Sequence, residues 1–478
     1  MKNLFIIPLL LFAVVFANGQ DTSSVYKKRV LESLELDILT SYFFQDGDNA
    51  AVTGGIGTEE LTDFTTDIVV SIPLNDDDVL TIDGGISAYT SASSSNLNPF
   101  NKSSEAYDEE AEDGNPDGPV TGSPWVASSG SSKGDLWIHA TIGYNHSSDN
   151  RNNIYSGHIS FASEYDYTSF GFGGGYARLF NDKNTELSFK ANVYLDKWSP
   201  EYPIEIISYI NHGENLNAGL FNGVDILDQN GNVIDKNGTK VWSPINTTLV
   251  ENKNRNTYSL SVGFSQIISK NAQFSVFLDV IQQEGWLANP MQRVYFGDRD
   301  NYYIGNPASI PIYTSKDNKD VFQLADDIER LPSSRTKYPL GARFNYYVNQ
   351  FIVVRTYYRY YYDNWGVNSH TINLEVPIKI GMRFTLYPSY RYYTQTAADY
   401  FAPYETALST SQFYTSDNDL SAFNSNQYGI GVSYTDIFTG FHIGKLGLKN
   451  IDFKYNYYQR NTNFNAGFFS LGFKFVVN

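Results

Sequence analysis

The sequence lacks cysteine entirely and, after residue 19, lacks any long apolar run. The absence of cysteine excludes disulfides and metal sites built from thiolates. No stretch beyond residue 19 approaches 18 consecutive apolar residues, so helical membrane spans are excluded as well. Basic residues are also scarce: 34 lysines and arginines face 52 aspartates and glutamates, and the net charge is −18. A chain this acidic is not expected to bind nucleic acid.

The first 19 residues have the pattern of a secretory signal. Lys2 precedes an apolar run from Leu4 to Phe16, and small residues follow at Ala17 and Gly19. This run is shorter than the roughly 20 residues that a membrane helix needs. A retained anchor is disfavoured because no stop-transfer pattern follows. We therefore predict a signal peptide at 1–19, cleaved after Gly19, and an exported domain at 20–478.

Aromatic residues and glycine are abundant, with 37 tyrosines, 32 phenylalanines and 37 glycines. The apolar residues recur with a period of two. In LELDILTSYFF, residues 34–44, most apolar side chains share one parity, while Glu35, Asp37 and Ser41 share the other. Such alternation indicates strands with one apolar and one polar face. It predicts about sixteen strands, at 30–45, 61–74, 79–91, 135–146, 153–166, 168–180, 185–198, 257–269, 273–283, 337–348, 350–362, 368–377, 382–396, 426–437, 450–460 and 467–477.

Strand and loop lengths identify the kind of all-β fold. Most predicted strands have 10 or more residues, whereas strands of soluble sandwiches usually have about 5 or 6 and a tilted membrane strand needs about 9 to 11. Tight turns alternate with long connections, which is typical of outer-membrane barrels. We predict a transmembrane antiparallel β-barrel of about 16 strands with long extracellular loops, preceded by a cleavable signal peptide and located in the cell outer membrane.

The long loops carry nearly all of the net charge. Residues 46–60, 92–134, 199–256, 284–336 and 397–423 together hold 30 of the acidic and 12 of the basic residues. The acidic run 105–118 is expected outside the cell with them. An anionic outer end would repel anions and gather divalent cations, although solubility alone also accounts for it. The last strand alternates Phe469, Leu471 and Phe473 with Ser470 and Gly472, as terminal barrel strands do.

The run QDGDNAAVTGGIGTEE, residues 45–60, combines carboxylates with glycines and suggests two loop chemistries. A calcium loop beginning at Asp46 would need glycine at its sixth position and glutamate at its twelfth, where Ala51 and Gly57 stand. A phosphate loop would need a lysine after the glycines, and Glu59 stands there instead. We therefore predict a connecting loop, with a looser cation site at Asp46 and Asp48 as the alternative.

The alternation also predicts which charged side chains face the lumen. Acids are expected on the first three strands and arginines on the tenth to thirteenth, on the opposite wall, with Glu375 as a nearby counter-charge. Such walls can select solutes by charge; alternatively, the groups pair and fill the interior. The ten candidates are Glu35, Asp37, Asp63, Asp67, Asp83, Arg343, Arg355, Arg359, Arg383 and Arg391.

No catalytic or cofactor site is predicted. The segment His146-Ser147-Ser148-Asp149 approaches a motif of outer-membrane lipid hydrolases, but it departs at Asp149 and lies in a predicted turn. The histidines His139, His158, His212, His370 and His442 show no metal-binding spacing. We therefore predict a protein that is not an enzyme and that needs neither a metal nor a cofactor.

Four segments resemble an uncharacterised family of Gram-negative outer-membrane β-barrel proteins of unknown function. They are residues 26–93, 123–135 (SPWVASSGSSKGD), 163–186 and 195–200 (LDKWSP), and the resemblance extends from about 26 to the C-terminus. Members are often encoded beside a small lipoprotein, a thioredoxin-like protein and a flavin transferase. The resemblance therefore implies a barrel fold and a link to envelope redox assemblies, although this chain has no haem, thiol or recognised flavin-attachment motif.

Two functions remain open from the sequence. The first is porin-like passage or binding of small polar solutes. The second is a structural or partner-binding barrel within an envelope assembly that is associated with redox or flavin chemistry. Outer-membrane lipid is the expected surrounding in both cases, and a periplasmic protein or lipoprotein is the expected partner in the second.

Overall fold

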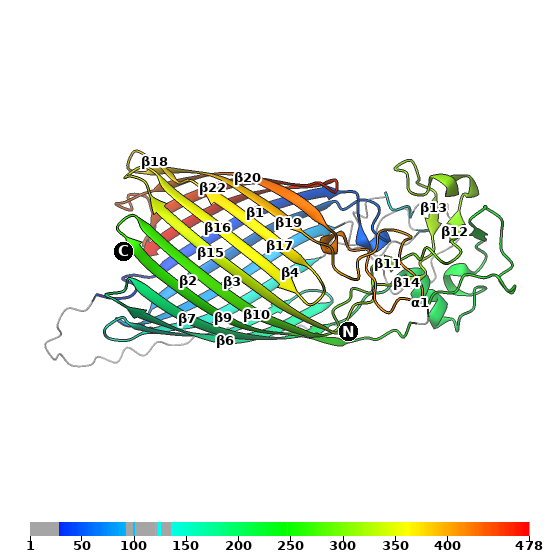
Figure 1. Cartoon of the computed structure of the whole chain (residues 1–478), viewed down its shortest axis with the longest axis horizontal. Helices are drawn as coiled ribbons and strands as arrows, with labels where there is room; N and C mark the ends of the chain where they lie inside the picture. The colour runs from blue at the N-terminus through cyan, green and yellow to red at the C-terminus, as the bar shows by residue number, and fades with distance from the viewer. Residues whose placement is uncertain are drawn as a thin grey trace.

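The computed structural model describes residues 28–91, 99–100, 120, 122–125, 135–245 and 247–477. The predicted signal peptide at 1–19 and the acidic run 105–118 lie outside the described residues. Sixteen long antiparallel strands form a closed barrel (Figure 1). They are β1 (Glu35–Gly47), β2 (Leu61–Pro73), β3 (Asp78–Ser91), β4 (Leu136–Ser147), β5 (Asn153–Ser163), β6 (Tyr167–Phe180), β7 (Thr185–Trp198), β9 (Lys253–Ser269), β10 (Ala272–Gly285), β15 (Ser334–Tyr347), β16 (Val353–Asp363), β17 (Asn368–Glu375), β19 (Phe384–Gln395), β20 (Phe423–Thr435), β22 (Leu446–Arg460) and β23 (Phe464–Val477).

The barrel closes between its first and last strands. Asp37 on β1 lies opposite Val69 on β2 and opposite Lys474 on β23. Each other barrel strand pairs antiparallel with its neighbours in chain order. Closure leaves no unpaired edge, which a strand structure needs in order to cross a bilayer. The predicted fold class, an antiparallel barrel of sixteen strands, is confirmed.

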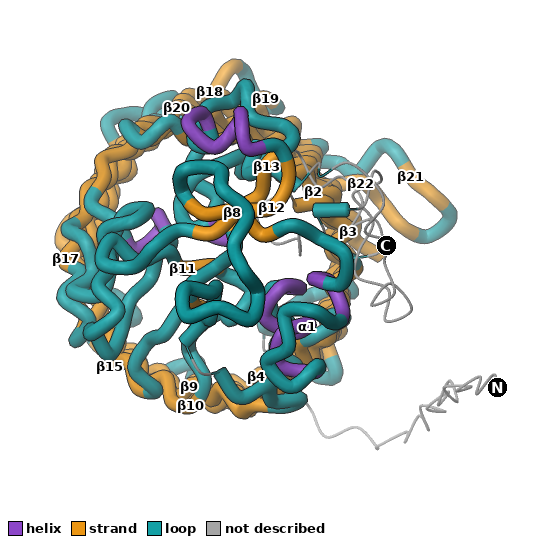
Figure 2. Tube along the Cα trace, turned by 90° about the vertical axis from the view of Figure 1, so that its right-hand side faces the viewer, coloured by secondary structure: helices purple, strands orange, loops and turns teal. Residues whose placement is uncertain are grey.

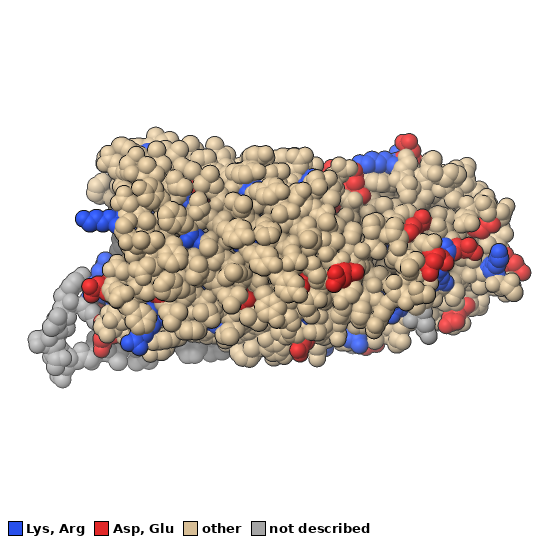
Figure 3. Space-filling view, viewed as in Figure 1, with Lys and Arg blue, Asp and Glu red and all other residues tan. Residues whose placement is uncertain are grey.

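The outer face of the barrel is apolar. Ile82, Ile142 and Ile159 lie opposite one another on three adjacent strands and are 43%, 48% and 52% exposed. Charged side chains are sparse on the flank of the barrel in Figure 3 and denser at its two ends. Alternation of apolar outward and polar inward residues is what lipid on one side and water on the other require. The structure is therefore a transmembrane barrel of the outer-membrane type.

Several strand bounds differ from those predicted. β1 begins at Glu35 and not at residue 30. Arg29, which precedes the predicted start of this strand, pairs with Asp76 in a turn at 2.9 Å. The twelfth strand is interrupted after β17, because Pro377 has no N–H to donate to a ladder. The pairing with β19 resumes in the short β18 (Ile378–Ile380). A further short strand, β21 (His442–Ile443), pairs with the start of β22 in the connection between β20 and β22.

The two ends of the barrel differ. We call the end with the short connections, such as 74–77 and 148–152, the turn end, and the other the loop end. At the loop end four connections, residues 48–60, 199–252, 286–333 and 396–422, form one folded unit, which we call the cap. It stands beyond the strand ends in Figure 1 and lies across the mouth in Figure 2. The long connections lie at the loop end, as predicted, but the alternation is incomplete, because the short connections 164–166, 364–367 and 461–463 lie there as well.

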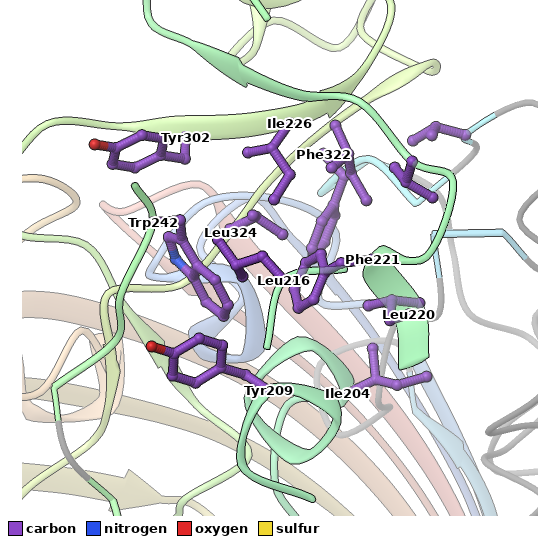
Figure 4. Packing of buried hydrophobic residues seen from close by; sticks show 13 residues of the cluster. Ile204, Tyr209, Leu216, Leu220, Phe221, Ile226, Trp242, Tyr302, Phe322 and Leu324 are labelled. Atoms are coloured by element: carbon purple, nitrogen blue, oxygen red, sulfur yellow. The ribbon is translucent and has the colours of Figure 1, made fainter. Parts of the chain in front are cut away.

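The cap is built from short elements around a hydrophobic core. Its elements are η1 (Ala51–Thr53), α1 (Ile204–Asn211), η3 (Gly219–Phe221), β8 (Ile226–Asp228), β11 (Arg293–Val294), β12 (Tyr302–Gly305), η4 (Pro307–Ile312), β13 (Val321–Gln323), β14 (Asp327–Ile328) and η5 (Asn418–Leu420). Trp242 is 1% exposed at the centre of the core, where it contacts Tyr209 and Phe221 with ring centroids 5.2 Å away (Figure 4). Its indole N–H donates to the Ala325 carbonyl at 3.0 Å. None of the described helices is long and apolar enough to cross a membrane.

Candidate functional site: the barrel interior and its capped mouth

The five predicted acids all lie on the inward face of β1, β2 and β3. The register places Phe43 opposite Asp63, Leu39 opposite Asp67, and Val69 opposite Asp83, and opposed residues share a face. The hydroxyl of Ser87 donates to the Asp63 carboxylate at 2.5 Å. Nε2 of His139 lies 3.3 Å from Oδ1 of Asp67 and 3.8 Å from Oδ1 of Asp83. This wall is therefore acidic, as the parity predicts.

Two of these acids have lysine partners that sequence analysis did not assign. Nζ of Lys474 lies 2.7 Å from the Glu35 carboxylate and 3.3 Å from that of Asp37. Nζ of Lys449 lies 3.0 Å from Glu35. Both lysines lie near these acids because closure places β23, which carries Lys474, beside β1, and β22, which carries Lys449, pairs with β23. The part of the acidic wall that has no lysine partner is therefore on β2 and β3.

Four of the five predicted arginines lie on the inward face of β15, β16 and β19. Arg355 lies opposite Glu375 and pairs with it at 2.8 Å, which confirms the counter-charge predicted for this wall. Arg343 packs over the rings of Phe277 and Tyr357, and its guanidinium carbon lies 5.4 and 5.7 Å from the ring centroids. These contacts are cation–π interactions, in which ring faces and not a carboxylate lie against the guanidinium.

The remaining two inward arginines are Arg359 and Arg391. The Arg359 guanidinium lies 5.6 Å from the Tyr361 ring centroid. Arg391 lies opposite Asn373 and Gln427. Within the part of the chain that the structure describes, Arg343, Arg359 and Arg391 make no ion pair. The four arginines and Glu375 leave this wall with a formal charge of +3, equal in size to the −3 that the five acids and their two lysine partners leave on the opposite wall.

Arg383 is the exception to the predicted set. It precedes β19, in the turn 381–383 at the turn end. Its guanidinium donates to the hydroxyl of Tyr434 at 3.2 Å, and Tyr434 lies opposite Phe384 on the outward parity. The parity rule was extended one residue too far, because alternation holds only while the chain is extended. Arg383 is therefore a residue of the barrel rim, not of the lumen wall.

Solvent exposure separates the barrel interior from the cap. The inward side chains of Arg355, Asp37 and Asp83 are 51%, 41% and 36% exposed. In the cap, Glu205 and Arg293 are 0% exposed. These lumen charges are therefore hydrated, while the Glu205 and Arg293 pair in the cap is dry. The long loops form a cap at the mouth and do not fill the bore beside these residues.

Arg293 joins three of the four cap connections. Its Nε and Nη2 donate to the two carboxylate oxygens of Glu205 at 2.8 and 3.0 Å. Its Nη1 donates to the Val52 carbonyl at 3.0 Å. Val52 belongs to the connection between β1 and β2, and Glu205 belongs to α1. A buried charge pair of this kind is tolerated only when its hydrogen bonds are satisfied, so Arg293 fixes the relative positions of these segments.

The glycine-rich segment 45–60 is a packed connection. Gly57 has φ of +106°, and a Cβ there would lie 2.2 Å from the Pro124 carbonyl oxygen, so only glycine fits. Asp48 pairs with Lys316 at 2.7 Å. No cluster of three or more potential metal ligands occurs among the described residues. The prediction of a connecting loop is confirmed, and its close packing within the cap was not predicted.

The hydrolase-like segment has other contacts. Nδ1 of His146 lies 2.7 Å from Oδ1 of Asp78, and the Ser148 hydroxyl donates to Oδ1 of Asn150 at 2.9 Å. His146 is the last residue but one of β4, and Ser148 lies in the turn that follows. These contacts hold a turn together and give no support to a base and nucleophile pair.

Where the cap meets the barrel, carboxyl groups are buried. Burial, together with a smaller contribution from the nearby Asp417 carboxylate, raises the pKa of Glu329 from its ordinary 4.5 to about 8. Burial likewise raises the pKa of Glu59 to about 7 and that of Asp326 to about 6. The Asn289 backbone N–H donates to Glu329 at 2.6 Å. The folded cap therefore holds protons near neutral pH that the unfolded chain would release.

Cap stability should consequently fall as the pH rises. A carboxyl whose pKa is higher in the folded state favours folding fully below the unfolded value, near 4.5 for Glu329, and this advantage disappears as the pH passes about 8. Hydrogen exchange of cap amides should be slower at about pH 5.5 than at about pH 8.5, after correction for intrinsic exchange rates. Glu329→Gln should flatten this dependence. An equally steep dependence in that variant would contradict the assignment.

The geometry defines the class of protein: a sixteen-stranded membrane barrel with a hydrated, charged interior and a folded cap at one mouth. The chain belongs to the family described as "Protein of unknown function (DUF3570)", whose model matches residues 23–470. The family resemblance drawn from the sequence is thereby confirmed. No curated protein matches the sequence.

The chain is similar to several solved structures. A bacterial polysaccharide outer membrane secretin is 9% identical, with 93% of this chain and 99% of that chain covered and a TM-score of 0.41. Pseudomonas aeruginosa OpdK with vanillate is 7% identical, with 93% and 98% covered and a TM-score of 0.34. A mutant of the ferric enterobactin receptor from Pseudomonas aeruginosa is 11% identical, with 89% and 53% covered and a TM-score of 0.37.

Proposed function

We propose that this protein is an outer-membrane barrel that passes or binds small polar solutes, with its cap on the extracellular side. Residues 1–19 would serve as the export signal and be removed. The observation that carries the proposal is the hydration of the inward charges, since the Arg355 side chain is 51% exposed inside a closed barrel. A barrel of sixteen strands is wide enough for an aqueous path. The cap then limits access from outside.

The positive charge of the arginine wall indicates which solutes such a path would attract. Lys474 and Lys449 offset part of the acidic wall, whereas Glu375 is the carboxylate that pairs with the arginine wall. Arginines near an aqueous path attract anionic groups. A solute would therefore meet a net positive surface along β15, β16 and β19.

Ion selectivity of the reconstituted protein tests this function. The full chain should give steady conductance in planar bilayers. Replacing both Arg355 and Arg359 with serine should shift the reversal potential in a salt gradient toward cation selectivity, because the wall loses two positive charges. Arg383→Ser, which removes a charge from the rim, is the matched control. Heat-modifiability gels check that each barrel is folded.

The outcomes of this experiment are distinct. Unchanged selectivity in a folded, conducting double variant would refute the arginine wall as a filter. Absence of conductance, both in the wild type and in a variant with a loosened cap, would refute passage of solutes.

A second function is a partner-binding or structural barrel of an envelope assembly. The observation that favours it is the dry packing of the cap across the mouth, with Trp242 and Arg293 fully buried. A rigid outer surface of this kind suits a permanent contact with a partner. In this role the charges of the lumen would not act on a passing solute, and no conductance is expected.

A further inference from the structure

A cavity lies on the inward face of β19, β20 and β22, close to the loop end. Its volume is about 330 Å³. The register builds its wall from successive rows across the three strands: Arg391, Gln427 and Tyr458 form one row, and Tyr393, Ser425 and Arg460 form the next. The full lining is Arg391, Tyr393, Gln395, Asp419, Phe423, Ser425, Gln427, Tyr458 and Arg460.

One of the two arginines in this cavity already has its partners. Arg460 donates to the Asp419 carboxylate at 2.6 Å and to the Tyr458 hydroxyl oxygen at 2.9 Å. Its guanidinium carbon lies 4.5 Å from the Phe423 ring centroid and 4.3 Å from that of Phe464. Asp419 is thus neutralised, and Arg460 is held in place between two rings.

The other arginine has no such partner. Arg391 is exposed, and within the described part of the chain it makes no ion pair and no side-chain hydrogen bond. With Arg460 and Asp419 offsetting each other, the cavity keeps one positive charge. The five N–H donors of the Arg391 guanidinium form a planar fork that matches a carboxylate.

Two further polar groups have a hydrogen-bonding position left for a ligand. The Tyr458 oxygen accepts from Arg460, so its own proton is free to donate. Gln427 donates its amide N–H to Oδ1 of Asn456 at 3.1 Å, which leaves its carbonyl oxygen as an acceptor. The Tyr458 hydroxyl, a donor beside Arg391, suits the anionic head of a ligand. The Gln427 carbonyl oxygen, an acceptor, suits a polar substituent on the body of that ligand.

Beside Gln395 and Ser425, the rest of the wall consists of two aromatic rings. The rings of Tyr393 and Phe423 have centroids 5.6 Å apart and are tilted by 42°. Together they offer an apolar surface for a planar group. The volume lies near the lower limit of roughly 300 to 1,000 Å³ that ligand sites show, so the ligand must be compact.

We propose that this cavity binds a small organic carboxylate with a planar body. Its carboxylate lies against the Arg391 guanidinium and the Tyr458 hydroxyl, and its body lies against Tyr393 and Phe423. The proposal rests on the proposed function, because it names the class of solute that the lumen would hold.

Calorimetric titration of the folded full chain in detergent with benzoate tests this site. Benzoate should bind, and benzamide, which has the same shape without the charge, should bind at least about 10-fold more weakly. Acetate, which has the charge without the ring, should also bind more weakly. Arg391→Gln should weaken benzoate binding by about 10- to 100-fold, since charge-assisted hydrogen bonds are lost. Arg383→Gln should leave it unchanged.

Each outcome decides a separate part of the proposal. Equal binding of benzoate by the Arg391→Gln and Arg383→Gln variants would overturn the site, and equal binding of benzamide and benzoate would overturn the carboxylate. If Arg391→Gln fails to fold, Arg391→Lys keeps the charge without the fork and should still weaken binding. Benzoate binding without any conductance would refute passage and leave this site standing; conductance without binding would do the reverse.

Discussion

Replacing Arg293 with methionine is expected to lower the free energy of unfolding of the cap by about 3 to 5 kcal/mol, because it leaves the Glu205 carboxylate buried without its partner. Both side chains are 0% exposed, so water cannot take the place of the guanidinium. The loss also removes the hydrogen bond to the Val52 carbonyl, and with it the link to the first connection. Denaturant titration followed by tryptophan fluorescence measures the change, since Trp242 lies in the cap core.

The matched controls separate a buried pair from an exposed one. Lys316→Met removes the partner of Asp48, but the Lys316 side chain is 67% exposed, so the change should cost at most about 1 kcal/mol. A double variant, Arg293→Met with Glu205→Leu, should recover much of the loss, because apolar pairs often replace buried ion pairs without penalty. The single variant Arg293→Met should also give a larger conductance than the wild type. A cost for Arg293→Met as small as that for Lys316→Met would contradict the assigned role.

The barrel could be predicted from the sequence because its rule is local. Each strand must show period-two alternation to satisfy lipid and lumen, and the signal is readable one segment at a time. The same rule placed Arg355 opposite Glu375 once strand order was known. It failed at Arg383, where the chain turns and the alternation stops. Pro377 could have indicated the break before that turn.

The lysine partners of Glu35 were within reach of the same reasoning. Lys474 shares the parity of Ser470 and Gly472, and barrel closure sets the last strand beside the first, so Lys474 lies opposite Asp37. Lys449 was harder to place, because it lies next to a bulge in the pairing of β22 with β23, where parity is lost.

The cap could not be predicted in this way. Its core joins residues from separate connections, such as Trp242 and Phe322, and no short-range period links them. The Arg293 and Glu205 pair joins residues 88 positions apart. Loops of 40 to 60 residues that carry tryptophan and isoleucine were the available signal, since a solvated loop has no need of them. The cavity beside Arg391 could not be predicted for a related reason, because Asp419 and Arg460 meet only where the cap connection returns to the barrel rim.

Replacing Ile142 with arginine is expected to destabilise the barrel in lipid by about 2 to 4 kcal/mol, the cost of a charge at the bilayer midplane on the lipid face of a strand. Ile142 is the seventh of the twelve residues of β4, is 48% exposed, and lies between Ile82 and Ile159 on the adjacent strands. Thr141→Arg is the matched control, because Thr141 is one residue away, faces inward and lies opposite Asp83. The inward arginine meets water and a carboxylate, so this variant should lose less than about 1 kcal/mol. Reversible unfolding in vesicles, together with heat-modifiability gels, measures both. Equal losses would mean that the two faces of β4 do not differ, and the assignment of lipid and lumen sides, on which the arginine wall and the carboxylate cavity depend, would fail with it.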